Sequence, residues 1–259
     1  MTFTRPIVSE IATRRLPVPG TYNLRDVGGL PTSDGGTIRW RTLLRSDALH
    51  RLDDAGREQL SGIGLRTVID LREDDEVAVA PDRLGDLGVR LVRRPLYESR
   101  TSGIPQPSLS SRTLADIYAM LARDRGDALV EVLRLLAQPG VLPAVVHCSA
   151  GKDRTGIVIA LVLATVGVSD DIIAADFAAT AELMEGAFRA ELIARNLERG
   201  LSEERATALL SAEPELILGF LDAVRASHGS VAGFLAHHGM TEAERAMLRA
   251  SLVEGIEPP

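Results

Sequence analysis

The chain has 259 residues, of which 45% are hydrophobic, 25% charged and 3% aromatic, values typical of a folded globular protein and not of a collagen, a coiled coil or a disordered chain. Its net charge is −7, from 29 basic and 36 acidic residues, and no stretch dense in lysine and arginine forms the basic stripe that nucleic-acid binding requires. The single cysteine, Cys148, excludes an internal disulfide, so the hydrophobic core must stabilise the fold.

The N-terminal residues carry no export or membrane signal, so we expect a cytoplasmic protein by default. Residues 1–19 lack the roughly 7 to 15 apolar residues of a signal peptide, and no uncharged run reaches the about 18 residues that a membrane-spanning helix requires. Export by a route without a signal peptide stays open.

The first part of the chain alternates short β-rich runs with turn signals. We expect residues 37–44 to form a strand pair or an edge strand, and Asp53 or Asp54 to cap a short helix. The apolar runs 66–71 and 89–96 have the length of strands and predict two buried ones.

The second part of the chain is mainly helical in pattern. Residues 114–136 have helical spacing, 144–148 predict a buried strand, and 156–166 predict an apolar helix too short for a membrane. From Ser169, whose hydroxyl can cap a helix, the rest predicts helices only, and residues 241–244 form a capping box for the last one. No internal repeat divides the chain, so we expect a single domain over residues 1–259, with one long connection at 99–111.

The chemistry-bearing motif is the segment 147–156, His-Cys-Ser-Ala-Gly-Lys-Asp-Arg-Thr-Gly. Cys148 ends a predicted strand, Arg154 follows six residues later, and a helix begins there. The five residues between them can curl so that their N–H groups form a nest for a tetrahedral dianion, to which the helix N-terminus adds about half a positive charge. The same field favours a nucleophilic thiolate, and Arg154 can hold two phosphoryl oxygens.

The other residues of this motif have expected supporting roles. Gly151 permits backbone angles that other residues avoid, and Lys152, the only lysine of the chain, places a charge at the loop rim. Thr155 can donate its hydroxyl to the thiolate, and His147 is a hydrogen-bonding partner that shapes the loop. The residues expected to surround a bound phosphate are Ser149, Ala150, Gly151, Lys152, Asp153 and Arg154.

At these residues the chain resembles the cysteine-dependent protein tyrosine phosphatase superfamily, whose phosphate loop has the form His-Cys, five residues, Arg, Ser/Thr. It is similar in particular to the bacterial tyrosine phosphatase branch, which has mycobacterial members. Three features carry this narrower resemblance: the loop end 150–156, the upstream Asn-Leu-Arg-Asp-Val-Gly-Gly of 23–29, and the triplets Arg-Ser-Asp at 45–47 and Asp-Leu-Arg at 70–72. The match spans roughly residues 22–168.

The resemblance implies an α/β fold with a central, mostly parallel sheet flanked by helices, and a phosphate loop between strand and helix. It also implies a helical C-terminal part with a lid at about residues 176–225. The apolar stripe of Leu183, Met184, Ala187 and Phe188 fits either core packing or such a lid. The implied substrates are phosphotyrosine proteins, with an extension to phosphoserine, phosphothreonine or phosphoinositides, and no cofactor is implied.

The implied mechanism is a two-step displacement without metal: Cys148 attacks phosphorus, a phosphocysteine forms while an acid protonates the leaving oxygen, and water releases phosphate. Two aspartates are candidates for the acid. Asp153 lies inside the loop, where the bacterial branch has an aspartate, although a helix-start aspartate also simply favours the helix dipole. Asp70 ends a predicted parallel strand at the ligand-binding edge, although it can equally hold Arg72.

Several alternatives stay open at this stage. Segment 23–29 brings Arg25 or Asp26 toward the site, or forms a turn that Asp26 stabilises. Three other functions compete with that of a protein tyrosine phosphatase. The protein could act on phosphoinositides, transfer sulfur as a rhodanese does, or bind phosphorylated ligands without turnover. The remaining histidines lack metal-site spacing with carboxylates or thiols, which predicts no metal site; they are His50, His228, His237 and His238.

Overall fold

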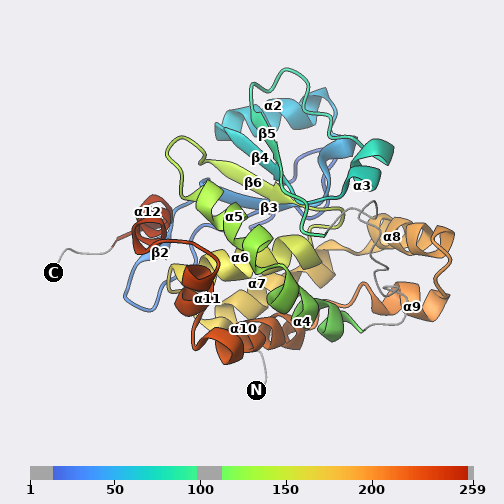
Figure 1. Ribbon diagram of the computed structural model, residues 1–259. Helices are drawn as coiled ribbons and strands as arrows, with labels where there is room; N and C mark the ends of the chain where they lie inside the picture. The colour runs from blue at the N-terminus through green and yellow to red at the C-terminus, as the bar shows by residue number, and fades with distance from the viewer. Residues whose placement is uncertain (1–13, 98–112, 256–259) are drawn as a thin grey trace.

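A five-stranded sheet forms the centre of the structure, a computed structural model that describes residues 14–97 and 113–255 (Figure 1). In spatial order its strands are β1 (Arg25–Asp26), β3 (Leu43–Ser46), β6 (Ala144–His147), β4 (Thr67–Asp70) and β5 (Arg90–Arg93). Strand β1 is antiparallel to β3, and all other pairs are parallel. The expected mostly parallel sheet is confirmed.

Helices pack on both faces of this sheet (Figure 1). They are α2 (Asp54–Ile63), α3 (Asp74–Val79), α4 (Leu114–Asp124), α5 (Gly126–Leu136), α6 (Asp153–Thr165), α7 (Asp170–Leu183), α8 (Gly186–Glu198), α9 (Glu203–Ala208), α10 (Pro214–His228), α11 (Val231–His237) and α12 (Glu242–Leu252), with a 3-10 turn at Leu49–Arg51. The cores of the expected helices are confirmed, and Thr241 begins α12 through the expected capping box. Residues 99–111, the expected long connection, lie outside the described residues.

Alternating strand residues supply the two halves of the core. Val68 and Val145 pack with Leu60 of α2 on one face, whereas Ile69 and Val146 join the larger cluster with α5 and α6 on the other. Strand β6 is fully buried, as its apolar sequence predicts for a central parallel strand. Strand β5 differs from the prediction because it is an edge strand: Arg90 and Leu91 are exposed, and only Val92 is buried.

The register of the strands places the phosphate loop at one sheet edge. Ser46 and Asp70 both lie opposite His147, the last residue of β6. The loops that follow β3, β4 and β6 therefore leave the sheet at the same edge, the usual ligand-binding edge of an open α/β sheet.

Residues 37–44 do not form a strand pair or one continuous edge strand; only their first part is an edge strand. Strand β2 (Thr37–Ile38) pairs with β7 (Val253–Glu254) in a separate two-stranded sheet, and β3 is an interior strand of the main sheet. Arg41 explains the division, because its φ of 55° interrupts the extended backbone between the two runs. Strand β7 also shows that the chain after Ser169 is not helical throughout.

The helical spacing expected over 114–136 is confirmed, and it is divided between two helices, α4 and α5. The backbone leaves helical geometry at Arg125, where φ is −127° and ψ is 19°, and α5 starts again at Gly126. Ser169 stands at the N-cap position of α7, but its hydroxyl bonds Asp171 and not a backbone amide. Among the described helices, none is both long and apolar enough to cross a lipid bilayer.

The region expected to contain a lid divides into two parts by packing. Buried residues of α7 and α10 belong to the main core cluster. Phe188 and Leu192 of α8 instead form a small separate cluster with Met184, which precedes α8, and Leu210, which follows α9; α9 packs against α8. Whether any of these helices moves as a lid stays a prediction.

Candidate active site

The phosphate loop joins β6 to α6, and its carbonyl groups are held from outside. Three successive carbonyl oxygens accept hydrogen bonds: Ser149 O from Ala48 N at 3.2 Å, Ala150 O from Asn23 Nδ2 at 2.9 Å and Gly151 O from Arg45 Nη2 at 2.8 Å. The next carbonyl, of Lys152, accepts from Gly156 N at 2.7 Å at the start of α6. The loop is therefore curled and not extended.

The amides of the loop are left available on its inner side. Within the described part of the chain, the N–H groups of residues 149–154 form no hydrogen bond. Gly151 has a φ of 68°, and a Cβ there would lie 2.4 Å from Ser46 O, so the expected need for glycine is met by both conformation and space. Free amides at a helix N-terminus form an anion-binding nest.

Arg154 is held in place by Glu76 of α3. Its Nη2 donates to Glu76 Oε1 at 2.7 Å and its Nη1 to Glu76 Oε2 at 2.5 Å, while the guanidinium lies over the Tyr97 ring, 5.5 Å from the centroid. Burial alone would lower the pKa of Arg154, but Glu76 and the Cys148 thiolate raise it well above its usual value. Burial would raise the pKa of Glu76, but Arg154 lowers it to about 2.

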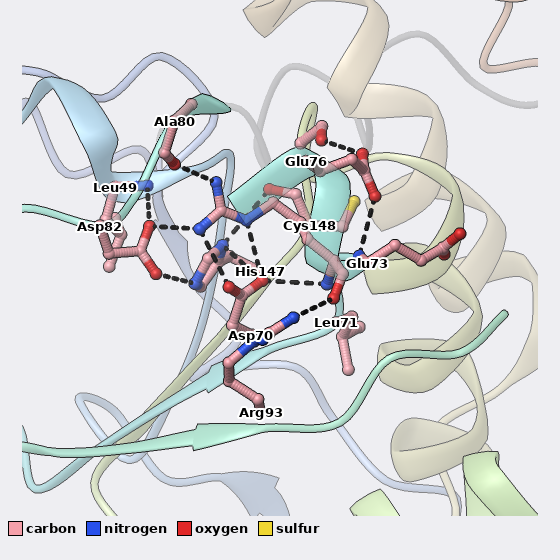
Figure 2. Close-up of polar contacts among 12 residues, drawn as sticks. Leu49, Asp70, Leu71, Glu73, Glu76, Ala80, Asp82, Arg93, His147 and Cys148 are labelled. Carbon is pink, nitrogen blue, oxygen red and sulfur yellow. Dashed lines mark hydrogen bonds and ion pairs between the residues drawn. The ribbon is translucent and has the colours of Figure 1, made fainter. Parts of the chain in front are cut away.

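Cys148 is a buried free cysteine, with 3% of its surface exposed. Figure 2 shows its sulfur on the same side of the site as Glu76. Ser149 follows it and donates its hydroxyl to the same Glu76 carboxylate. Sequence reasoning missed Glu76, although its position in the first turn of the helix after β4, at the edge where Cys148 lies, was a usable signal.

Asp153 opens α6 and reaches the solvent side of the loop. Its Oδ1 accepts a hydrogen bond from the Tyr118 hydroxyl at 2.7 Å and lies 3.2 Å from Lys152 Nζ, and 30% of its side chain is exposed. Burial, followed by the Asp153 charge, raises the pKa of Tyr118 well above its usual value, so the phenol stays a neutral donor. A carboxyl with a fixed orientation and solvent access can exchange protons.

The Asp70 side chain is fully buried, and both of its carboxylate oxygens accept hydrogen bonds. Both of its oxygens accept from Arg72, Oδ1 from Nε and Oδ2 from Nη2 at 2.9 Å each, and Oδ1 also accepts from the Arg72 backbone amide. Of the two roles considered for Asp70, acid or partner of Arg72, this geometry matches the second.

His147 lies beneath the loop in a buried ion-pair cluster (Figure 2). Its Nε2 lies 3.2 Å from Asp82 Oδ2 and its Nδ1 lies 3.3 Å from the carbonyl oxygen of Cys148, which supports the expected shaping role. Burial would lower the pKa of His147, but Asp82 and then Asp70 raise it. Asp82 also accepts from Arg72 Nη2 at 2.9 Å, and nothing in the sequence motif indicated it.

The cluster of Asp70, Asp82 and His147 has ligand atoms within 4.8 Å of one another, a spacing that could hold a metal ion. Arg72 is hydrogen-bonded to both carboxylates, however, and its guanidinium already supplies the positive charge. This cluster therefore does not need a metal to balance its charge.

Lys152 and Thr155 differ from their expected arrangements. Lys152 Nζ donates to Leu209 O at 2.6 Å and Ser211 O at 2.7 Å, and the side chain is 1% exposed, so the ammonium lies under the segment after α9 and not at the loop rim. The Thr155 hydroxyl is buried without a hydrogen-bond partner among the described residues, so the expected bond to the sulfur is not formed.

Asp176 of α7 connects the upstream segment to the phosphate loop. It accepts from Arg25 Nε at 3.2 Å and from Arg45 Nη1, and the same Arg45 holds the carbonyl of Gly151. The Asp26 carboxylate instead accepts a hydrogen bond from Gly28 N at 2.8 Å. Asp26 therefore stabilises a turn within segment 23–29, which is one of the two alternatives considered for it. The two arginines lower the pKa of Asp176 despite its burial, which acts to raise it.

Comparison with known proteins agrees with this geometry. A model of the tyrosine phosphatase family matches residues 16–254, most of the chain. The chain belongs to the tyrosine phosphatase family. The triple specificity protein phosphatase PtpB of Mycobacterium tuberculosis is 31% identical over an alignment of 283 positions, which covers 94% of this chain and 100% of that protein. A putative tyrosine-protein phosphatase of Cupriavidus necator is 29% identical, with 90% of this chain and 86% of that protein covered.

Among solved structures, the crystal structure of P. aeruginosa TpbA covers 68% of this chain and 89% of its own, with 21% identity and a TM-score of 0.34. Family membership confirms the resemblance seen at the phosphate loop. The protein is therefore a phosphoric monoester hydrolase, a protein tyrosine phosphatase whose substrates are phosphorylated.

Proposed function

We propose that Cys148, Arg154 and Asp153 carry out the two steps of phosphotyrosine hydrolysis. In the first step the Cys148 sulfur forms a bond to phosphorus as the tyrosyl oxygen leaves, and Asp153 transfers its proton to that oxygen. In the second step Asp153 accepts a proton from water, whose oxygen displaces the sulfur and releases phosphate. The outward-held carbonyls of residues 149–151 support this proposal most directly, because they leave the amides facing the position of the phosphoryl oxygens.

The choice of Asp153 over Asp70 as the acid rests on accessibility. The Asp153 side chain is 30% exposed and accepts a hydrogen bond from Tyr118, so it has access to a leaving group at the loop mouth. Asp70 is buried and its two oxygens are occupied by Arg72, so a proton on Asp70 would break a buried ion pair. Asp70 therefore has a structural role in this proposal.

The range of substrates beyond phosphotyrosine is the second part of the proposal. A relative named as a triple specificity phosphatase supports activity beyond phosphotyrosine, on phosphoserine, phosphothreonine and phosphoinositides. Lys152, the cation expected to favour a phosphoinositide, is however buried against Leu209 and Ser211. Family membership gives no support to the sulfurtransferase, and an intact Cys148 and Arg154 argue against a module without turnover.

We also propose that α8 and α9 form a lid on the phosphate loop. Ala150 of the loop packs against the cluster that contains Phe188, and Phe188 stacks on Tyr22 with ring centroids 4.4 Å apart. Lys152 ties the other side of the loop to the residues after α9. For the compartment, an unpaired cysteine that must stay reduced to act as a nucleophile favours a reducing environment, so a cytoplasmic location is our working proposal.

Kinetics with two leaving groups test the catalytic assignment. Cys148→Ser should abolish hydrolysis of a phosphotyrosine peptide, and undiminished activity would refute the thiolate mechanism. Asp153→Asn should lower kcat for phenyl phosphate by on the order of 10²–10⁴, but much less for p-nitrophenyl phosphate, whose leaving group needs no proton. Asp70→Asn should affect both substrates equally, and a leaving-group effect in this variant instead of Asp153→Asn would transfer the acid role to Asp70.

A further inference from the structure

Three histidines that are separated in the sequence come together at the ends of two helices. His228 is the last residue of α10, His237 is the last residue of α11, and His238 follows it. One ring nitrogen from each lies within 4.8 Å of the others. The helix α11 packs against both α10 and α5 (Figure 1), so the cluster lies where these three helices meet.

The spacing of the three rings matches a tetrahedral metal site. The ring centroids are 4.7 Å apart for His228 and His237, 4.9 Å for His237 and His238, and 5.6 Å for His228 and His238. For three imidazoles around one Zn²⁺ with Zn–N bonds of about 2.0–2.1 Å and tetrahedral angles, the centroids would be about 5.2 Å apart. The three observed centroid distances differ from this value by about 0.5 Å or less, so side-chain adjustment would be needed only to turn the ring nitrogens toward one ion.

In two of the three histidines, Nδ1 forms a hydrogen bond that leaves Nε2 available as a metal ligand. His238 Nδ1 lies 2.7 Å from Asp127 Oδ1, so Nδ1 carries the proton and Nε2 keeps its lone pair. His228 Nδ1 lies 2.8 Å from Ser227 Oγ, whose own hydrogen is donated to Ala223 O at 2.8 Å. Ser227 must then accept from His228, which also leaves Nε2 with its lone pair. An outer carboxylate or hydroxyl on each ligating histidine is typical of metal sites.

Packing fixes the orientation of the His238 ring. A Cβ on Gly126 would lie 2.0 Å from Nε2, 2.3 Å from Cε1 and 2.5 Å from Cδ2, nearly equal distances that place it over the face of the ring. The ring therefore lies flat against the glycine backbone. Phe234 contacts the same ring with centroids 4.7 Å apart. This close contact gives a reason for glycine at the first position of α5.

We infer that His228, His237 and His238 bind a divalent transition-metal ion of the Zn²⁺ class. Neutral imidazoles are preferred ligands of Zn²⁺, and three of them with water as the fourth ligand complete a tetrahedron. The ion would join the C-terminal ends of α10 and α11, with Asp127 linking the site to α5. It is independent of the phosphatase chemistry, and it replaces the expectation of no metal, which considered only spacing along the chain.

Metal titration tests this inference. We would titrate metal-free Cys148→Ser protein with Co²⁺, following the visible absorption of tetrahedral cobalt, and with Zn²⁺ by calorimetry, because removing the thiol excludes it as a competing ligand. One ion should bind per chain. In the same background, His237→Ala and His238→Ala should weaken binding by tenfold or more, and Asp127→Asn by about 10- to 100-fold, as expected for an outer ligand partner.

Two controls separate site loss from misfolding. His50→Ala, which removes a histidine on another part of the fold, should leave the affinity unchanged. Circular dichroism melts of each variant in EDTA should match the parent, and Zn²⁺ should raise Tm only where the three histidines are intact. Equal affinity in the parent and in a triple His→Ala variant would overturn the inference, as would the absence of any one-to-one binding by the parent.

Discussion

Glu76 of α3 and Arg154 of α6 form two parallel hydrogen bonds, with Nη2 2.7 Å from Oε1 and Nη1 2.5 Å from Oε2. An arginine has five N–H donors; Glu76 takes two of them, and the second hydrogen of Nη1 points to Leu71 O and Glu73 Oε1, 3.5 Å away. The Nε–H and one Nη2–H remain for a phosphoryl group while Glu76 holds the guanidinium in position. Arg154 lowers the pKa of Glu76 to about 2 against the effect of burial, so the pair is ionised at neutral pH.

We therefore predict that Glu76→Gln lowers kcat/KM by up to about 100-fold, since a misplaced guanidinium loses its alignment with the transition state. The inhibition constant of vanadate should rise in parallel. Steady-state kinetics on p-nitrophenyl phosphate would measure both. Asp75→Asn on the exposed side of the same helix is the matched control and should behave like the parent. Parent-like kinetics for Glu76→Gln would mean that the pair does not position Arg154.

Asp176→Asn should destabilise the protein by about 3–5 kcal/mol, because Arg25 and Arg45 would remain buried without their counter-charge. It should also weaken phosphate binding, since Arg45 holds the Gly151 carbonyl outward. Urea denaturation and phosphate inhibition measure the two effects. Asp170→Asn removes a surface pair with Arg225 from the same helix and should cost no more than about 1 kcal/mol. A similar loss in both variants would contradict the account.

The His147 and Asp82 pair should make stability depend on pH. The pKa of His147 is raised in the fold by Asp82, against the effect of burial, so its contribution is full below the unfolded value of about 6.5 and is lost as pH rises through the folded value. The pKa of Asp82 is lowered, against the effect of burial, by His147 and then Arg72, so its contribution is lost in acid, below about pH 4. The pair therefore stabilises the fold most between these limits.

Urea denaturation of the parent and Asp82→Asn across pH measures this contribution. The difference in unfolding free energy between them should be largest near pH 6 and should shrink as the medium becomes alkaline. Exposed Asp86, on the same loop, supplies the control variant Asp86→Asn, which should show no such profile. A difference that grows with rising pH would show that His147 is neutral in the fold.

Hydrogen exchange should distinguish α8 and α9 from the rest of the C-terminal helices. Their small cluster predicts faster amide exchange there than in α10, which packs in the main core. A bound phosphate analogue should slow exchange in α8 and α9 if they close on the loop. Unchanged protection on binding would remove the lid proposal.

The motif around Cys148 could be predicted from the sequence because its parts are neighbours in the chain. Strand, loop and helix follow within ten residues, and each residue type there has its own chemical reason. Glu76 and Asp82 could not be assigned in this way, since their partners, Arg154 and His147, lie more than 60 residues away and meet them only through the parallel register of β4 and β6. The division of residues 37–44 between two sheets could not be predicted, because a β-rich run does not show which sheet a strand joins.

A crystal structure with bound vanadate tests the central claim most directly. We predict vanadium bonded to the Cys148 sulfur, with its equatorial oxygens within about 2.7–3.2 Å of the amides of residues 149–154 and of the Arg154 guanidinium. Vanadate bound elsewhere, or loop amides turned away from it, would contradict the proposal that this loop holds the phosphoryl group for attack by Cys148.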